Sequence, residues 1–186
     1  NTSLQKYGGD MAVASMSILN SIMQFVMLLL PGLVQGAQPL LSYNLGAQNI
    51  LRVKKTFRLL LVCCVSGSFL IWLVCMIMPA TVASVFTSDT ALIAYTEKSM
   101  RVYLAMLLIY GVHVACQYSF VALDQAKKAI FLTIWRKIIL LIPLIFILSR
   151  ILSGSAMGVY LAEPIADTIA VCTTVPMFFC YYRKLK

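Results

Sequence analysis

The stretch GLVQGAQPLLSYNLGAQN, residues 32–49, lies in a run of sequence that contains no charged residue between Asp10 and Arg52. It mixes glycines, a proline, glutamines and asparagines with apolar neighbours. The uncharged run has 41 residues, and a helix of that length would be about 60 Å long, twice the hydrocarbon core of a bilayer. Part of the run is therefore expected to turn.

The composition favours lipid as the solvent of this chain. With 61% hydrophobic residues and a mean hydropathy of +0.92 over 186 residues, it has more apolar surface than a water-soluble domain of this size could bury. The net charge of +9 would also suit a nucleic-acid-binding protein. The basic residues, however, stand in clusters between apolar blocks, so the expected partner is the lipid bilayer and not a nucleic acid.

Charge spacing divides the chain into apolar blocks of membrane length. Thirty uncharged residues separate Arg58 from Asp89, and 22 separate Arg101 from Asp124. A helix needs about 20 apolar residues to cross a bilayer. The sequence therefore predicts an all-α polytopic membrane bundle, a single transmembrane unit over residues 1–186. The limits expected for its five helices are 10–43, 52–86, 90–123, 126–152 and 155–183.

The basic residues predict the orientation in the membrane. Eleven of them flank the first joint, the third joint and the C-terminus, and four lie on the opposite side. Under the positive-inside rule this distribution places the C-terminus in the cytoplasm. Five crossings then put residue 1 outside, with no signal peptide before it. Earlier helices are therefore expected upstream of this sequence.

Small and polar residues recur at helical spacing in and around the opening stretch. One face, where small residues would let another helix pack closely, carries Gly32, Gly36, Pro39, Tyr43 and Gly46. A neighbouring face carries Gln24, Pro31, Gln35, Gln38 and Ser42. Amides exposed to lipid are costly, so this second face should meet protein or a water-filled cavity. Gln35 and Gln38 are candidates for a substrate or ion pathway, with a hydrogen-bonded helix interface as the alternative.

The third expected helix has the most varied face. Its residues at steps of three and four are Tyr103, Met106, Tyr110, His113, Gln117, Phe120 and Asp124. Aromatic rings attract organic cations and methionine adapts to varied shapes, so Tyr110, His113 and Gln117 are candidates for the pathway. An imidazole can exchange a proton near neutral pH, although His113 could equally form an interhelical hydrogen bond. Asp124 could pair with Lys127 or Lys128.

The last expected helix contains two acids, Glu163 and Asp167, one turn apart on the same face. An ionisable group inside the membrane is a functional candidate by default, and Asp167 is therefore placed in the ion pathway. The alternative is structural pairing, in which Arg150 could reach Glu163 while Arg136 lies toward the inner end of the preceding helix. Pro143, between the two arginines, is expected to kink that helix.

Several segments resemble one transporter family. They are YGGDMAVASMSIL…PGLVQGAQPLLSYNLGAQNILRVKKTFR from Tyr7 to Arg58, ALDQAKKAIFLTIWRKIILLIPLIFIL, and GVYLAEPIADTIA. They resemble the multidrug and toxic compound extrusion (MATE) family, and within it the bacterial MepA-like branch. The resemblance implies a twelve-helix antiporter made of two six-helix bundles, with this chain as most of the second bundle and the N-terminal half missing. It also implies a bacterial cytoplasmic membrane, again with the C-terminus inside.

Two features of the sequence depart from the family pattern. Asp124 stands where a glycine is expected. Sodium-coupled members commonly carry a carboxylate within the tenth helix, where this chain has His113 and Gln117, so the sodium site of the second bundle does not carry over.

The resemblance implies the function of a secondary active transporter. It would export small cationic or amphipathic drug-like compounds in exchange for protons or sodium by alternating access, with no cofactor other than the coupling ion. One alternative is a lipid-linked oligosaccharide flippase of the same superfamily, which should have more cationic residues in its cavity. Another is a membrane-embedded enzyme, which would need a clustered nucleophile and base or metal-ligand spacing. The six cysteines and the single histidine show no such spacing, so no metal site is expected.

Overall fold

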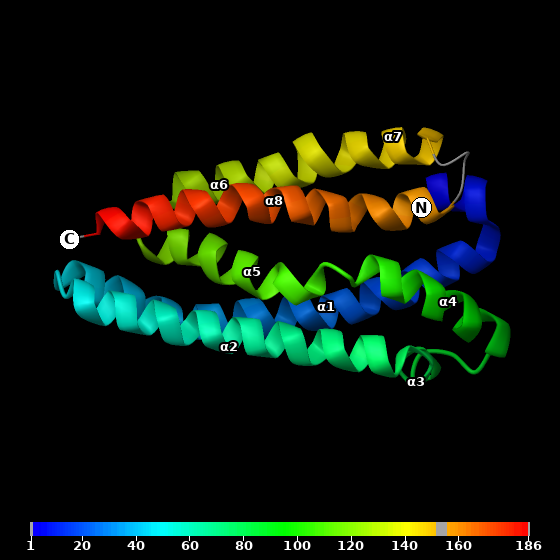
Figure 1. Cartoon of the computed structure of the whole chain (residues 1–186), viewed down its shortest axis with the longest axis horizontal. Helices are drawn as coiled ribbons and strands as arrows, with labels where there is room; N and C mark the ends of the chain where they lie inside the picture. Colours follow the sequence, from blue (N-terminus) through cyan, green and yellow to red (C-terminus); the bar gives the residue numbers. More distant parts are fainter. Residues whose placement is uncertain (1, 152–155, 186) are drawn as a thin grey trace.

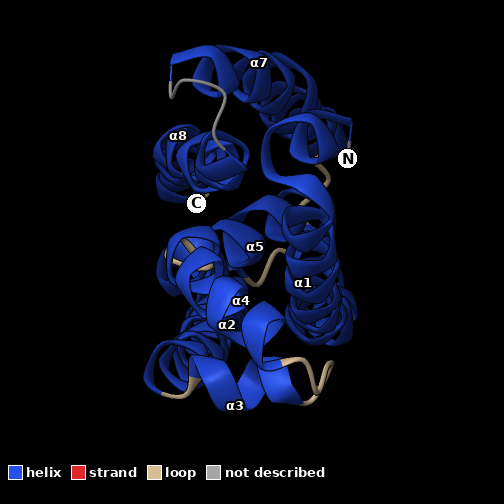
Figure 2. Ribbon diagram, turned by 90° about the vertical axis from the view of Figure 1, so that its right-hand side faces the viewer, coloured by secondary structure: helices blue, strands red, loops and turns tan. Residues whose placement is uncertain are grey.

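The computed structural model describes residues 2–151 and 156–185, and every element in this part of the chain is helical. The helices run roughly along the long axis of the molecule (Figure 1). Seen along that axis, α7 and α8 lie on one side, α2 and α3 on the opposite side, and α1 and α5 between them (Figure 2). The elements are α1 Thr2–Gly46, α2 Ile50–Ile77, α3 Pro79–Ser84, α4 Thr90–Tyr103, α5 Leu107–Ala122, α6 Ala126–Ile134, the π-helix η1 Trp135–Leu141, α7 Ile142–Ile151 and α8 Ala156–Lys184.

Helix α1 is longer than the segment 10–43 expected from the sequence. It extends to Gly46 and leaves helical geometry only at Gly9, where φ is 63° and ψ is −165°. Pro31 and Pro39 lie inside α1 without ending it. The uncharged run is therefore helical through most of the opening stretch.

The expected turn lies at residues 47–49, at the end of that stretch. There the Asn49 N–H donates to the Asn44 carbonyl at 2.8 Å. The Asn49 side chain accepts from the Arg52 N–H at 3.2 Å and caps α2. The asparagines of the opening stretch thus close one helix and start the next.

The segment 52–86, expected as one helix, is divided into α2 and α3. Helix α2 ends at Ile77, and α3 begins at Pro79. Proline has no N–H to donate to the preceding turn and suits the first position of a helix. Pro79 therefore explains why the second helix stops short of residue 86.

The segment 90–123 is a bent pair of helices. Helices α4 and α5 meet at an angle of 50° across residues 104–106. At the bend the Leu107 N–H donates to the Leu104 carbonyl at 3.0 Å, a bond to the third preceding residue. This tighter turn replaces one turn of α-helix and redirects the chain without a proline or glycine.

The segment 126–152 contains an unexpected π-helix. Residues Trp135–Leu141 bridge α6 and α7, and Pro143 is the second residue of α7. Proline lacks the N–H that would continue the regular ladder, and π-helical turns are one way in which a helix absorbs such an interruption. The irregularity expected at Pro143 therefore appears in the turns before it. Residues 152–155, which join the fourth and fifth expected helices, lie outside the described part.

The helix lengths confirm an all-α polytopic bundle. Four spans are long and apolar enough to cross a membrane, and the bent pair α4 and α5 makes a fifth when taken as one span. The four spans are Gly9–Gly46, Ile50–Ile77, Ala126–Leu148 and Tyr160–Lys184. The result agrees with the five spans expected from charge spacing.

Helices α2 and α5 pack closely against each other in the core. Gly111 of α5 lies so near α2 that a Cβ atom at this position would collide with the Cys64 backbone carbonyl and the Ser68 hydroxyl. By contrast, a Cβ at Gly67 of α2 would meet only the end of the Leu30 side chain, at 3.4 Å. Gly111 is therefore the glycine on which the packing of α5 against α2 depends.

Asp124, where a glycine is expected, has the left-handed backbone angle φ 58°. A residue with a Cβ atom is strained in this region and glycine is not. We expect Asp124→Gly to raise the unfolding free energy by about 1 kcal/mol, measured by thermal unfolding in detergent. Ala94→Gly, inside α4, is the matched control and should lower it by about 1 kcal/mol. Equal losses in both variants would contradict the prediction.

Candidate functional site

A group of polar side chains lies buried between α4, α5, η1 and α8. We call it the central polar cluster, and its members are Tyr103, Tyr110, His113, Arg136, Glu163 and Asp167. The residues come from four elements, of which α4 and α5 are consecutive in sequence, and α8 contacts the other three (Figure 1). Charged groups at this depth in a membrane protein are expensive unless paired, so their partners decide what the cluster can do.

The centre of the cluster is an ion pair between η1 and α8. The Arg136 Nε lies 2.5 Å from the Asp167 Oδ1, and the two side chains are 11% and 7% exposed. The Arg136 guanidinium also lies over the Tyr110 ring, 5.4 Å from its centroid, a favourable cation–π position. Asp167, expected in the ion pathway, is thus held by a charged partner, and that partner is Arg136.

The second acid of α8 has a different partner. The Tyr103 hydroxyl donates to the Glu163 Oε2 at 2.6 Å, joining α4 to α8. The structural alternative from the sequence, pairing of Glu163 with Arg150, involves a side chain that lies outside the described residues. A small cavity of about 10 Å³, close to the space of one water molecule, is bordered by Tyr103, Tyr110, Glu163 and Asp167. The two acids therefore border the same enclosed space.

His113 is buried beside this ion pair. Its side chain is 2% exposed, and its ring lies 5.9 Å from the Tyr110 ring. In the part of the chain that the structure describes, neither ring nitrogen has a hydrogen-bond partner. A buried polar group without a partner is unusual, and the neighbouring side chains that act on this ring are Arg136 and Gln117.

Gln117 is not part of the central cluster. Its amide donates to the Thr133 hydroxyl at 2.7 Å, linking α5 to α6. The pair borders a groove of about 280 Å³ between these helices. Tyr110 and His113 of the expected stripe are therefore brought together at Arg136, whereas Gln117 contacts a different helix.

The glycine face of α1 is uncovered. Gly32, Gly36, Pro39 and Gly46 are exposed, and apart from the nearby backbone of α1 itself, no atom of the described chain lies within 4 Å of a Cβ built at the three glycines. The expected packing against another helix is thus absent here, because α1 buries its aliphatic face instead. The residues of that buried face are Val26, Leu30, Val34 and Leu41.

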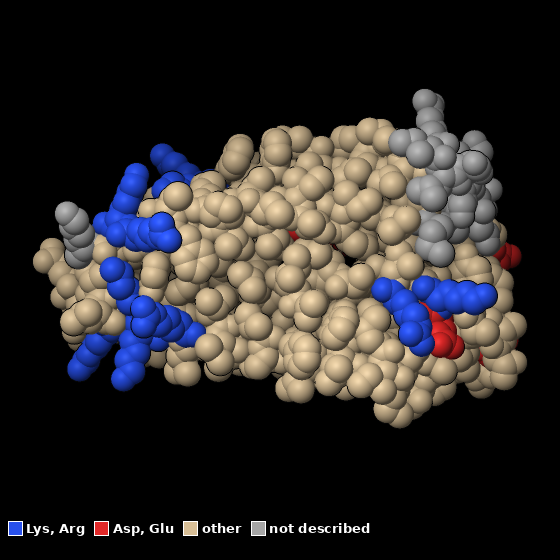
Figure 3. All heavy atoms as spheres, in the orientation of Figure 1, with Lys and Arg blue, Asp and Glu red and all other residues tan. Residues whose placement is uncertain are grey.

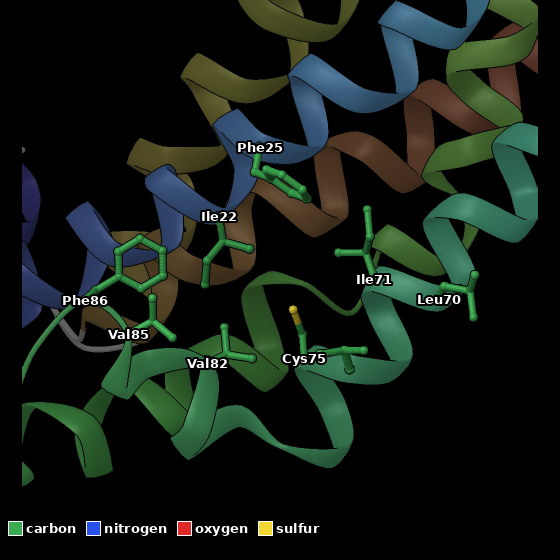
Figure 4. Close-up of a pocket in the computed structure, with 9 residues that line it drawn as sticks. Ile22, Phe25, Leu70, Ile71, Cys75, Val82, Val85 and Phe86 are labelled. Carbon is green, nitrogen blue, oxygen red and sulfur yellow. The ribbon is translucent and has the colours of Figure 1, made fainter.

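The amide face of α1 is also accessible. Gln35 is exposed and Gln38 is half-buried. A groove of about 460 Å³ follows the neighbouring glycine face, and it is lined by Phe25, Leu28, Leu29, Gly32, Leu33 and Gly36. A second, entirely apolar groove of about 440 Å³ lies where α1 faces α2 and the segment after α3 (Figure 4). Both grooves include Phe25.

Asp124 makes no ion pair among the described residues. The Lys128 Nζ instead lies 4.8 Å from the centroid of the Tyr181 ring. The expected pairing with Lys127 or Lys128 is therefore replaced, at Lys128, by a cation–π contact.

Sequence reasoning missed the two pairings that join the cluster. Arg136 and Asp167 are 31 residues apart, and Tyr103 and Glu163 are 60 apart. The available signal was that Arg136, Glu163 and Asp167 are charged residues within apolar segments and therefore need partners. Which helix supplies the partner depends on helix rotation and packing, which the sequence does not display.

Several apolar spans that enclose a buried charge pair define a polytopic membrane protein. Residues 2–147 match the family profile of MatE, and the chain belongs to this family. It is 28% identical over 182 residues to the multidrug export protein MepA of Staphylococcus aureus (strain N315), covering 95% of this chain and 38% of that protein. The MepA of Staphylococcus haemolyticus (strain JCSC1435) is also 28% identical, with 93% and 37% covered.

Solved structures show the same fold. The MATE multidrug transporter DinF-BH, solved as a complex, is 30% identical, with a TM-score of 0.81 over 95% of this chain and 39% of that one. A MATE protein in the bent conformation is 15% identical, with a TM-score of 0.90 over 100% of this chain and 41% of that one. The chain thus spans about two fifths of the length of the relatives it matches.

Proposed function

We propose that this chain is the C-terminal lobe of a transporter that exports drug-like compounds across a bacterial cytoplasmic membrane. The observation that carries the proposal is its similarity, over 95% of its length, to proteins named multidrug export protein. A structural neighbour of 30% identity is named a multidrug transporter. The substrates proposed are small cationic or amphipathic molecules.

The proposed substrate pathway runs along the accessible side of α1. Gln35 and Gln38 supply amides there, and the groove beside Gly32 and Gly36 supplies apolar surface. Pockets for drug-sized ligands combine mainly apolar walls with a few polar groups. This side lacks a covering helix in the described chain, which suits a pathway whose other wall is the N-terminal lobe.

The proposed coupling site is the central polar cluster. A proton taken up by Asp167, or a sodium ion that competes with Arg136 for its carboxylate, removes the attraction that holds η1 to α8. A ligand shifts a conformational equilibrium only when it binds the two states unequally. The ion pair would make the affinity of Asp167 for the coupling ion differ between the two states, because the pair forms only when η1 and α8 are in contact. Alternating access then follows from movement of these helices against the rest of the lobe.

The flippase alternative receives no comparable support. It calls for several cationic residues in the cavity, whereas the buried Arg136 is neutralised by Asp167. The relatives reported above are named for multidrug export. Drug export is therefore the function that the residues and the relatives favour together.

Efflux is tested in bacteria that lack their main drug exporters. The protein expressed at its full natural length should lower the accumulation of a cationic dye, and residues 1–186 alone should not, because one lobe offers only one wall of the pathway. Dye export by residues 1–186 alone would contradict the two-lobe proposal. Full accumulation in cells with abundant full-length protein would contradict drug export itself.

The proposed orientation can be tested by labelling with a membrane-impermeant thiol reagent. After replacement of the native cysteines, Ser88→Cys should react from outside the cell and Gln48→Cys should not, since the basic clusters place residue 48 in the cytoplasm. Permeabilised cells provide the control, in which both positions should react. Labelling of Gln48→Cys but not of Ser88→Cys in intact cells would contradict the proposal that the C-terminus lies in the cytoplasm.

A further inference from the structure

One end of the bundle is almost purely basic. We call it the basic end, and it is formed where α2 and α6 begin and α8 ends (Figure 3, left). Its residues are Arg52, Lys54, Lys55, Arg58, Lys127, Lys128, Arg183 and Lys184. Of the six acidic side chains in the sequence, Asp124 alone belongs to these segments. The positive charge here is therefore hardly neutralised within the chain.

Two neighbouring tyrosines of α8 hold the basic end together. The Tyr181 hydroxyl donates to the Leu123 carbonyl at 3.1 Å, at the turn before α6. The Tyr182 hydroxyl donates to the Lys54 carbonyl at 3.4 Å, in the first turns of α2. The end of α8 thus fixes the other two basic segments in position.

The rings of the same two tyrosines contact two lysines of the basic end, Lys54 and Lys128. The Lys128 Nζ lies 4.8 Å from the Tyr181 ring centroid, and the Lys54 Nζ lies 5.7 Å from that of Tyr182. Among the described residues neither lysine forms an ion pair. Each ammonium group is therefore placed by an aromatic ring while it remains available to an external anion.

The basic end lies at the level where the apolar membrane surface starts. Leu51 and Leu59 of α2 are 83% and 66% exposed, and Ile130 and Phe131 of α6 are 59% and 55% exposed. In a helix that crosses a bilayer, such side chains contact acyl chains, and adjacent lysines and arginines lie among the headgroups. The external anion at this place is then a lipid phosphate.

We propose that the basic end is a binding surface for anionic phospholipids, with Lys54 and Lys128 as its fixed phosphate contacts. The other six basic residues add attraction that is less dependent on position. Basic residues near an anionic membrane surface each contribute to binding, and the contribution falls off within a Debye length. This lipid binding does not depend on whether the protein exports drugs.

The test uses the protein purified in detergent at its full natural length. Short-chain phosphatidylglycerol, short-chain phosphatidylcholine and inorganic phosphate are titrated separately by calorimetry. We expect phosphatidylglycerol to bind more tightly than either of the others, and more weakly at high salt. Lys54→Gln and Lys128→Gln should each weaken it about fivefold, the factor that corresponds to about 1 kcal/mol.

Two control variants make the result decisive. Lys98→Gln with Arg101→Gln removes two charges at the opposite end and should leave phosphatidylglycerol binding unchanged. Lys54→Arg with Lys128→Arg keeps the charge and should retain most of the binding. Thermal unfolding of every variant identifies any that misfolds. If a glutamine variant misfolds, the phosphatidylglycerol affinity of the arginine variant is compared with that of the original protein instead.

Three outcomes would overturn the proposal. Equal affinity for phosphatidylglycerol and phosphatidylcholine would show that charge is not recognised. Equal affinity for inorganic phosphate would reveal a general anion site rather than a lipid surface. An equal loss in the Lys98 and Arg101 double variant would show that only net charge matters.

Discussion

Replacing Asp167 by asparagine is expected to lower the unfolding free energy by about 3–5 kcal/mol, the usual cost of leaving one member of a buried ion pair alone. The Arg136 side chain is only 11% exposed, so water cannot replace the lost carboxylate. The measurement is thermal unfolding of the purified full-length protein in detergent, together with its level in the membrane. An abundant Asp167→Asn protein with unchanged thermal stability would contradict a structural role for the pair.

A matched control and a paired variant separate charge from shape. Asp89→Asn makes the same chemical change at an exposed position that caps α4, and asparagine caps as well as aspartate. Its stability should change little. Replacing both partners, with Arg136→Met and Asp167→Leu, should restore most of the loss, because apolar residues can replace a buried pair at little cost.

The paired variant also tests the proposed coupling. If the ion pair only stabilises the bundle, the Arg136→Met and Asp167→Leu protein should still export dye against an imposed ion gradient. If the pair couples transport to ion movement, the protein should fold and bind substrate but fail to use the gradient. The two roles of the cluster are therefore distinguishable in one folded protein.

Gly111→Ala is expected to lower the unfolding free energy by about 3 kcal/mol, at the upper end of typical overpacking costs. The added methyl group collides with the Cys64 backbone carbonyl, which cannot move aside without shifting α2. The loss should outweigh the better helix propensity of alanine, which is about 1 kcal/mol. Thermal unfolding in detergent measures it.

Gly67→Ala provides the comparison for the Gly111 substitution. Its new methyl group would lie 3.4 Å from the Leu30 Cδ2, a flexible side-chain end that can adjust. Stability should stay within about 0.5 kcal/mol of the original or rise slightly. A similar loss in both variants would mean that helix packing in general, and not the contact at Gly111, limits stability.

Charge spacing is sufficient to predict the spans, because lipid excludes unpaired charges from long stretches of helix. It cannot predict the bend between α4 and α5. Residues 104–106 contain neither proline nor glycine, and the hydrophobic pattern continues across them. Breaks of this kind depend on how the two halves pack against their neighbours.

The candidate site is predictable as a set of residues but not as a set of contacts. Tyr110, His113 and Asp167 stand out in the sequence because polar groups in apolar helices need a reason to be there. That Arg136 lies between Tyr110 and Asp167 depends on the rotation of η1, and the π-helix changes the rotation that an α-helical count would give. The glycine face of α1 can be recognised in the sequence from its small residues at helical spacing, although no helix of the described chain packs against it.

The π-helix η1 also bears on how this helix can change length during evolution. Its hydrogen bonds span five residues instead of four, so the segment accommodates an additional residue relative to regular winding. Losing one codon between Trp135 and Leu141 can be absorbed by rewinding to an α-helix. The same loss in α6 would rotate all later residues of this helix by about 100° around the helix axis. Single-residue deletions in related chains should therefore be tolerated better in this segment than in the regular helix before it.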